Sequence, residues 1–194
     1  MNVADSEKLR EVVRGTGYEE AAEPAQADIV LINTCVVRQH AEDRAAGYIR
    51  SLSGLKQKNP NIIIGVCGCY VSEPGRDLKQ LFPHVDWFIP PNSPAVLRDY
   101  LLRVVGRESI VEPVTRDSGL VTIMHGCDNF CSYCVVPYVR GRETSRPIDE
   151  VLAEIKGLIG QGTTDITLLG QNVNSYKYGL ADLMNIIHSF DIGH

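Results

Sequence analysis

The sequence contains no apolar run of 18 or more residues, and its charged first segment, Met1 to Arg14, contains no apolar stretch like that of a secretory signal. These absences argue against a membrane partner and against export, so we expect a cytoplasmic protein. An excess of basic residues is also absent, because 19 Lys and Arg stand against 24 Asp and Glu, a net charge of −5. Any nucleic acid must therefore be recognised by a local patch rather than by overall charge.

Cysteines, by contrast, are plentiful and unevenly placed. The six of them form one group in the first half of the chain and one in the second: Cys35, Cys67 and Cys69, then Cys127, Cys131 and Cys134. A chain of this length can bury a core without disulfides, and nothing in it indicates export. We therefore interpret the cysteines as reduced thiols that bind metal.

Helical and strand patterns alternate along the first hundred residues. Apolar, β-branched runs predict three buried strands, at 28–33, 62–66 and 86–89. Helix-favouring stretches surround them, and an apolar stripe follows Pro94. This alternation predicts an α/β fold with a doubly wound parallel sheet over residues 1–105. No GxGxxG segment follows any of these strands, so the sequence does not support dinucleotide binding.

The second half begins after a polar segment, 106–119, which we interpret as a linker. Strand and helix patterns resume over residues 120–194, with strands predicted at 120–124 and 165–169 and helices at 145–160 and 180–190. Two βα units are too few to close a barrel of eight or six. We expect either that they extend the first sheet or that the chain is part of a longer protein.

Three cysteines with CxxxCxxC spacing, Cys127, Cys131 and Cys134, follow the strand predicted at 120–124. Soft thiolates this close together suit an iron–sulfur cluster or zinc. Three ligands on a four-iron cluster leave one iron open to a small chelating molecule, whereas zinc needs a fourth ligand, for which His125 is the candidate. Buried loop cysteines without any metal are the remaining alternative.

This loop, with Tyr133 between its last two cysteines, resembles that of the radical S-adenosylmethionine enzymes. The stretch from His125 to Pro147 (HGCDNFCSYCVVPYVRGRETSRP) is similar to one subgroup, the methylthiotransferases, and residues 168–176 (LLGQNVNSY) are similar to members that modify tRNA. The resemblance covers nearly the whole chain. It implies an N-terminal methylthiotransferase domain at 1–105, followed at 120–194 by the first βα units of an incomplete radical-SAM (βα) barrel, in a fragment of an enzyme.

The resemblance also implies a set of cofactor-binding residues. Cys127, Cys131 and Cys134 would ligate a 4Fe–4S cluster whose open iron chelates S-adenosylmethionine, so that one electron breaks a carbon–sulfur bond and yields a 5′-deoxyadenosyl radical. The residues implied to contact S-adenosylmethionine are Tyr133, Gly170, Gln171 and Asn172. An ordinary turn between strand and helix is the alternative for the last three.

The first half resembles the domain that carries the family's second, auxiliary 4Fe–4S cluster. Family members supply cysteines from GCxxN, NTC and GC segments; Cys35 matches the second and Cys69 the third. Both follow predicted strands, whose carboxyl ends converge at one edge of a parallel sheet. The first match fails, because Met1 to Glu7 resembles the continuation of the GCxxN segment, with its cysteine just upstream of residue 1. Cys67 is extra, either a buried small hydrophobe or a substitute ligand.

The only dense basic segment contains Arg140, Arg142 and Arg146. A phosphate-binding role toward a tRNA anticodon stem-loop suits it, and a solvated loop is the alternative. The resemblance implies methylthiolation of C2 of an N6-isopentenyladenosine beside the anticodon, with an electron donor such as flavodoxin or ferredoxin. Two alternatives stay open: methylthiolation of a threonylcarbamoyl-adenosine tRNA or a ribosomal protein, and a non-catalytic iron–sulfur or zinc module.

Overall fold

The computed structural model describes residues 1–35, 39–105 and 119–190. The chain forms two compact units, an N-terminal unit that includes Ala4–Glu112 and a C-terminal unit that includes Pro113–His194. The predicted linker, 106–119, lies outside the described residues except for Gly119. No helix in the described ranges is long and apolar enough to cross a membrane.

The N-terminal unit is built on a parallel sheet in the order β1 (Ile29–Thr34), β2 (Ile63–Gly68) and β3 (Trp87–Ile89). The helices around it are α1 (Asn2–Arg14), α2 (Gln39–Ser51), α3 (Ser53–Lys58), α4 (Leu78–Leu81) and α5 (Pro94–Val105), with short 3-10 turns at Pro24–Gln26 and Cys69–Ser72. All three strands thus lie where the sequence predicts them. Helix α4 is short, because Pro74 and Gly75 form a turn before it and Asp77 caps it by accepting a hydrogen bond from Gln80 N at 3.0 Å.

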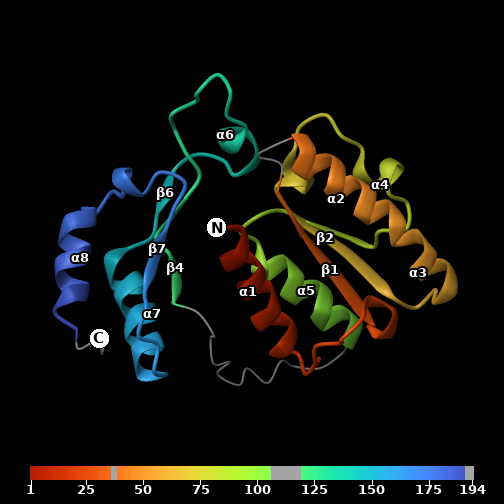
Figure 1. Cartoon of the computed structure of the whole chain (residues 1–194), viewed down its shortest axis with the longest axis horizontal. Coiled ribbons are helices and arrows are strands. Elements are labelled where there is room, and N and C mark those ends of the chain that lie inside the picture. The colour runs from red at the N-terminus through yellow and green to blue at the C-terminus, as the bar shows by residue number, and fades with distance from the viewer. Residues whose placement is uncertain (36–38, 106–118, 191–194) are drawn as a thin grey trace. The chain divides into compact units, whose positions relative to one another are not determined.

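Helices cover both faces of this sheet. Figure 1 shows α1 and α5 on one side of β1 and β2, and α2 and α3 on the other. On the α1 and α5 side, Cys67 and Ile89 pack with Leu97 and Leu101 of α5. Successive strand residues point to opposite faces, so the fully buried Val66 belongs to the other side. The mixed α/β fold with a parallel sheet is therefore confirmed.

The C-terminal unit contains two strand pairs. β4 (Leu120–Thr122) pairs in parallel with β7 (Thr167–Leu169), and β5 (Met124–His125) pairs antiparallel with β6 (Thr144–Ser145). Its helices are α6 (Val136–Val139), α7 (Ile148–Gly160) and α8 (Leu180–His188), with a 3-10 turn at Val173–Ser175. The single strand predicted at 120–124 is split at Ile123, because the chain leaves its parallel partner there and begins a hairpin.

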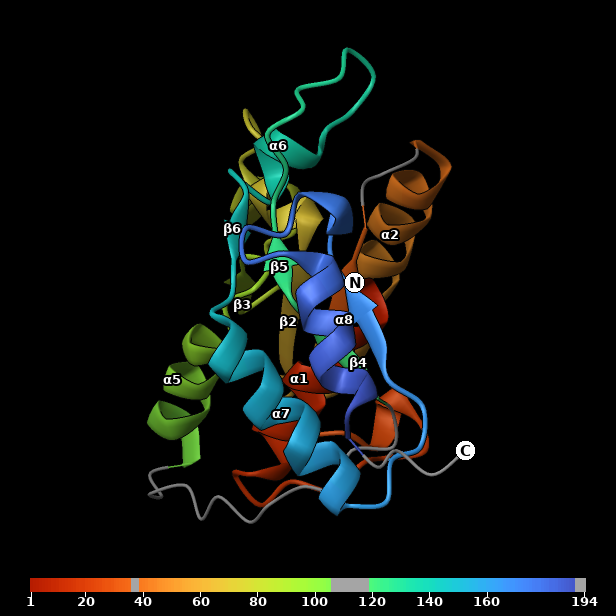
Figure 2. The same cartoon turned by 90° about the vertical axis from the view of Figure 1, so that its left-hand side faces the viewer.

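The core of this unit lies between the β4–β7 pair and helices α7 and α8. Val151, Ile155 and Leu158 recur at helical spacing on α7 and are buried together with Leu183 of α8. Figure 2 shows α7 and α8 side by side. This core supports β4 and β7. β4 leads through β5 into the first loop of the candidate site, and β7 leads directly into the second.

Candidate functional site

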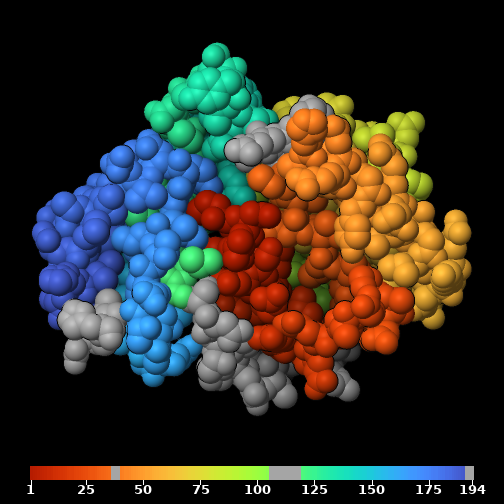
Figure 3. Space-filling view, viewed as in Figure 1, coloured from red at the N-terminus to blue at the C-terminus, as the bar shows by residue number. Residues whose placement is uncertain are grey.

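The cysteine loop, residues 126–143, connects β5 to β6 and contains α6. Cys127 is buried, Cys134 is half-buried and Cys131 is exposed, and all three are free thiols. Figure 3 shows part of this loop, coloured green, at the surface of the molecule. The structure therefore places the three thiols on one segment that begins at the carboxyl end of a strand.

Backbone contacts close the two ends of this loop on each other. The Cys127 N–H donates to Gly141 O at 3.2 Å. Gly126 has φ +71°, and a Cβ built on it would lie 2.1 Å from Arg142 O, so no other residue fits there without a shift. The tight pairing of the loop ends thus depends on a residue without a side chain.

Asp128 adds side-chain contacts across the same place. One carboxylate oxygen accepts from Glu143 N at 2.9 Å, and the Arg142 guanidinium pairs with Asp128 at 2.9 Å. Arg142 also lies over the Phe130 ring, 5.0 Å from its centroid. Asp128, the residue after the first cysteine, is thereby joined to the two residues that precede β6.

The thiols themselves do not converge. Within the described residues, no three His, Cys, Asp or Glu side chains are placed to hold a metal ion. The donor set still fits an iron–sulfur cluster chemically, because three free thiols lie on one loop and Cys131 and Cys134 are accessible. The exposed Tyr133 phenol hydrogen-bonds to Cys131, which raises the pKa of Tyr133.

The second loop of the site follows β7. A Cβ at Gly170 would lie 2.4 Å from Met124 Cγ, so this loop passes close to β5. Gln171 Oε1 is buried and has no hydrogen-bond partner among the described residues. A buried amide oxygen without a donor calls for an external donor, and the amino group of S-adenosylmethionine has the right chemistry. Asn172, the third residue predicted here, accepts from the Ser175 N–H through its backbone oxygen at 2.9 Å.

In the N-terminal unit, the structure brings Cys35 and Cys69 to one edge of the sheet. Thr34 pairs with Gly68 at the ends of β1 and β2, and the two cysteines are the next residues of the two segments. Gly68 has φ +93°, and a Cβ there would lie 2.5 Å from Thr34 O. Asn33 Nδ2 donates to Asn2 O at 2.9 Å, which holds the first turn of α1 at the same edge.

Cys67 has a different environment. It lies within β2 and is 1% exposed, packed in the apolar core under α5. Burial raises the pKa of its thiol to about 12, so the thiol is neutral at physiological pH. The structure thus favours the interpretation of Cys67 as a small core residue over that of a substitute ligand.

The three arginines of the basic segment have unequal surroundings. Arg142 is largely exposed and pairs with Asp128. Arg140 is half-buried. The Arg146 guanidinium donates to Thr122 O at 2.7 Å and pairs with Glu154 of α7 at 2.6 Å, which ties α7 to β4. Because the Arg146 guanidinium already has these partners, the structure argues against a role for Arg146 in binding a phosphate of the tRNA.

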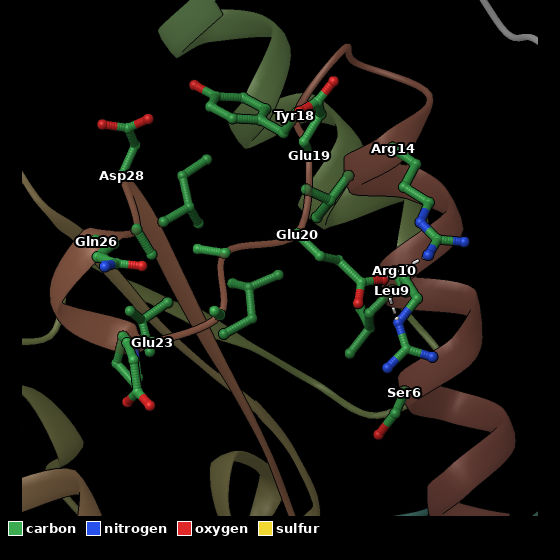
Figure 4. A pocket seen from close by; sticks show the side chains of 18 of the residues that line it. Ser6, Leu9, Arg10, Arg14, Tyr18, Glu19, Glu20, Glu23, Gln26 and Asp28 are labelled. Carbon is green, nitrogen blue, oxygen red and sulfur yellow. Dashed lines mark hydrogen bonds and ion pairs between the residues drawn. The ribbon is translucent and has the colours of Figure 1, made fainter.

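A cavity of about 570 Å³ lies elsewhere in the N-terminal unit, between α1, β1 and the segment that joins them. Figure 4 shows Arg10 and Arg14 of α1 turned toward Glu20 at its rim; their ion pairs with Glu20 measure 2.9 and 2.7 Å. None of the six cysteines lines this cavity.

The sequence did not point to Asp128, Glu143 or Ser175. Their roles come from hydrogen bonds between residues 15 and 32 positions apart, and only the folded hairpin shows which residues meet. An acidic residue directly after the first cysteine was the only available signal.

Comparison with known families assigns the two units to two classes. Residues 1–90 match the Uncharacterized protein family UPF0004, and residues 121–191 match the Radical SAM superfamily. The cysteine loop and the 170–175 loop both lie within the second match. The C-terminal unit is thus of the radical S-adenosylmethionine class.

Curated relatives combine both units. The chain is 44% identical over 200 residues to a tRNA-2-methylthio-N(6)-dimethylallyladenosine synthase of Clostridium perfringens (strain 13 / Type A). The aligned region covers 94% of this chain and 45% of the relative. Synthases of the same name from Clostridium novyi (strain NT) and Shouchella clausii (strain KSM-K16) are 43% and 40% identical over 98% and 99% of the chain, and 48% and 42% of their own lengths. The chain is thus similar over almost its whole length to these synthases, and it spans less than half of their length.

Proposed function

We propose that this chain carries the cluster-binding part of a radical S-adenosylmethionine tRNA methylthiotransferase, one that adds a methylthio group to C2 of N6-isopentenyladenosine beside the anticodon. The observation that carries the proposal is the cysteine loop, three free thiols in CxxxCxxC spacing at the carboxyl end of a strand. The names of the 40–44% identical relatives support the same reaction.

In this proposal Cys127, Cys131 and Cys134 hold a 4Fe–4S cluster, and Gly170, Gln171, Asn172 and Tyr133 contact S-adenosylmethionine. The bound cluster and S-adenosylmethionine supply a radical reaction, which adenine C2–H requires because it offers no acidic proton to a general base. The chain's own contribution is placement. Asp128 and Gly126 keep the ends of the cysteine loop together, and the buried Gln171 Oε1 accepts from the amino group of the ligand.

An auxiliary 4Fe–4S cluster in the N-terminal unit completes the proposal. Cys35 and Cys69 supply two of its ligands from neighbouring strand ends, and a third ligand comes from outside this pair. Arg140 and Arg142 lie within the cysteine loop and offer positive charge to the tRNA backbone. A flavodoxin-like or ferredoxin-like protein in the cytoplasm delivers the electron, and the two βα units are the start of a longer barrel.

The proposal is tested by anaerobic reconstitution of the full chain with iron and sulfide. We expect S-adenosylmethionine to change the electron paramagnetic resonance spectrum of the reduced cluster, and reduction to release 5′-deoxyadenosine. Cys131→Ala removes an accessible ligand and should abolish both effects. Cys67→Ala is the matched control, because Cys67 is a core residue, and should retain both.

A cluster whose spectrum is indifferent to S-adenosylmethionine would contradict the proposal and favour an electron-transfer or structural module. Zinc without iron in the purified protein would do the same. Equal behaviour of the Cys131→Ala and Cys67→Ala variants would show that the cysteine loop is not the site.

A further inference from the structure

We propose that Glu143 and Ser175 are positioning residues that hold the cysteine loop in a set place relative to the 170–175 loop. The inference rests on the proposed function, because it assigns the two loops to the cluster and to S-adenosylmethionine. The Ser175 hydroxyl donates to Glu143 Oε2 at 2.6 Å, across 32 residues of sequence. Neither residue belongs to the predicted ligand set.

The link continues from one predicted site to the other. The Glu143 N–H is held by Asp128, which is bonded directly to Cys127. At the other end, the Ser175 hydroxyl also lies 2.9 Å from Asn172 O. An unbroken series of covalent and hydrogen bonds thus joins the first cysteine to the loop expected to contact S-adenosylmethionine.

Two further hydrogen bonds fasten the same pair of segments. The Tyr176 hydroxyl donates to Arg146 O at 2.8 Å, and Lys177 N–H donates to Ser145 Oγ at 3.1 Å. Tyr176 is 4% exposed and belongs to the core of the unit, so its bond supports the fold as a whole. The Glu143–Ser175 bond lies closer in sequence to both predicted sites, and a carboxylate acceptor makes it stronger than a neutral pair.

Cluster binding and the relative placement of the two loops are thereby assigned to different residues. The thiols bind the cluster, whereas the Glu143–Ser175 bond sets the distance from that cluster to the groups that receive the amino acid part of S-adenosylmethionine. Loss of the bond should leave the cluster in place and weaken S-adenosylmethionine binding, because the ligand must reach both loops at once.

The test uses the reconstituted full chain with Ser175→Ala, Glu143→Ala, Glu143→Gln and Tyr176→Phe. We expect iron and sulfide content to equal that of the unmodified chain in all four. Ser175→Ala and Glu143→Ala should raise the dissociation constant of S-adenosylmethionine about tenfold, the range expected for loss of one hydrogen bond to a charged group. They should also alter the spectral change that S-adenosylmethionine causes in the reduced cluster.

Glu143→Gln keeps an oxygen that accepts from Ser175 and should restore near-normal affinity. Tyr176→Phe should lower thermal stability without changing that affinity. Unchanged affinity in both alanine variants, or iron loss in either of them, would overturn the positioning role. If the unmodified chain holds iron yet does not bind S-adenosylmethionine, the proposed function itself fails, and this result is distinct from a failure of the variants alone.

Discussion

At the scale of single residues, two cysteines separated by one position are both buried but lie in different local structures. Cys67 lies within β2, whereas Cys69 begins the 3-10 turn after the strand, at the sheet edge and next to the segment that carries Cys35. Strand alternation and the left-handed Gly68 between them direct the two residues differently. The proposal therefore assigns Cys69, beyond the end of its strand, to the auxiliary cluster, and Cys67, within the strand, to the core.

The raised pKa of Cys67 gives a test of this distinction. In the apo protein at pH 8, iodoacetamide should modify the exposed Cys131 readily and leave Cys67 unmodified, because thiolate is the reactive form and the pKa of Cys67 is about 12. Peptide mass spectrometry reports both sites in one sample. After unfolding in urea, Cys67 should react as well.

The same group makes the free energy of unfolding depend on pH. The folded protein keeps the Cys67 proton up to about pH 12, whereas the unfolded chain, with an ordinary value of 9.0, loses it earlier. Stability from this group is therefore present below pH 9 and is lost as pH rises toward 12. Urea denaturation at pH 8 and at pH 10 should show that Cys67→Ala loses less unfolding free energy between the two pH values than the unmodified chain does. Alkylation of Cys67 in the native protein at pH 8 would contradict its assignment to the core.

At the scale of elements, the β5–β6 hairpin depends on one glycine. Gly126→Ala places a Cβ against Arg142 O and also forces an alanine to φ +71°, so we expect a loss of at least about 3 kcal/mol in unfolding free energy. Gly141→Ala is the matched control, since Gly141 has φ +80° and no atom within 4 Å of the added Cβ. Its cost should be about 1–2 kcal/mol from the backbone conformation alone. Thermal unfolding followed by circular dichroism measures both, and equal losses would refute the close-packing argument.

Elements with a strong local pattern were predictable from sequence, and elements defined by distant partners were not. The strands at 28–33 and 62–66 are continuous β-branched runs, and α7 has an apolar stripe, so their own residues specify them. The break at Ile123 has no such signal, because it arises where β4 leaves β7 and β5 meets β6. The ion pair between Arg146 and Glu154 likewise depends on how α7 packs, so the sequence showed only a basic segment.

The candidate site shows the same division. The spacing of Cys127, Cys131 and Cys134 is a local motif, and it led directly to the class of cofactor. The hydrogen bonds of Asp128 and Glu143 join residues far apart in the sequence, and no sequence motif predicts them. The proposed function thus comes from a short local motif, whereas the contacts that hold the residues of that motif became apparent only in the fold.

At the scale of the whole molecule, the two cysteine groups belong to separate compact units that match different families. Each unit has its own sheet and its own buried core. Cluster binding in one unit should therefore not require the cysteines of the other. This independence gives the proposed two-cluster arrangement a direct test.

Iron content after reconstitution should fall in separate steps as the cysteine groups are removed. The double variant Cys35→Ala, Cys69→Ala should lose one four-iron cluster and still respond to S-adenosylmethionine, because the cysteine loop is intact. The triple variant of Cys127, Cys131 and Cys134 should lose the response and keep the iron of the N-terminal unit. If the double variant loses no iron, Cys35 and Cys69 hold no cluster in this chain, and if either variant loses all of it, the sites are not independent. Circular dichroism of both apo variants separates ligand loss from unfolding, because a variant that keeps the spectrum of the unmodified apo chain has lost ligands and not its fold.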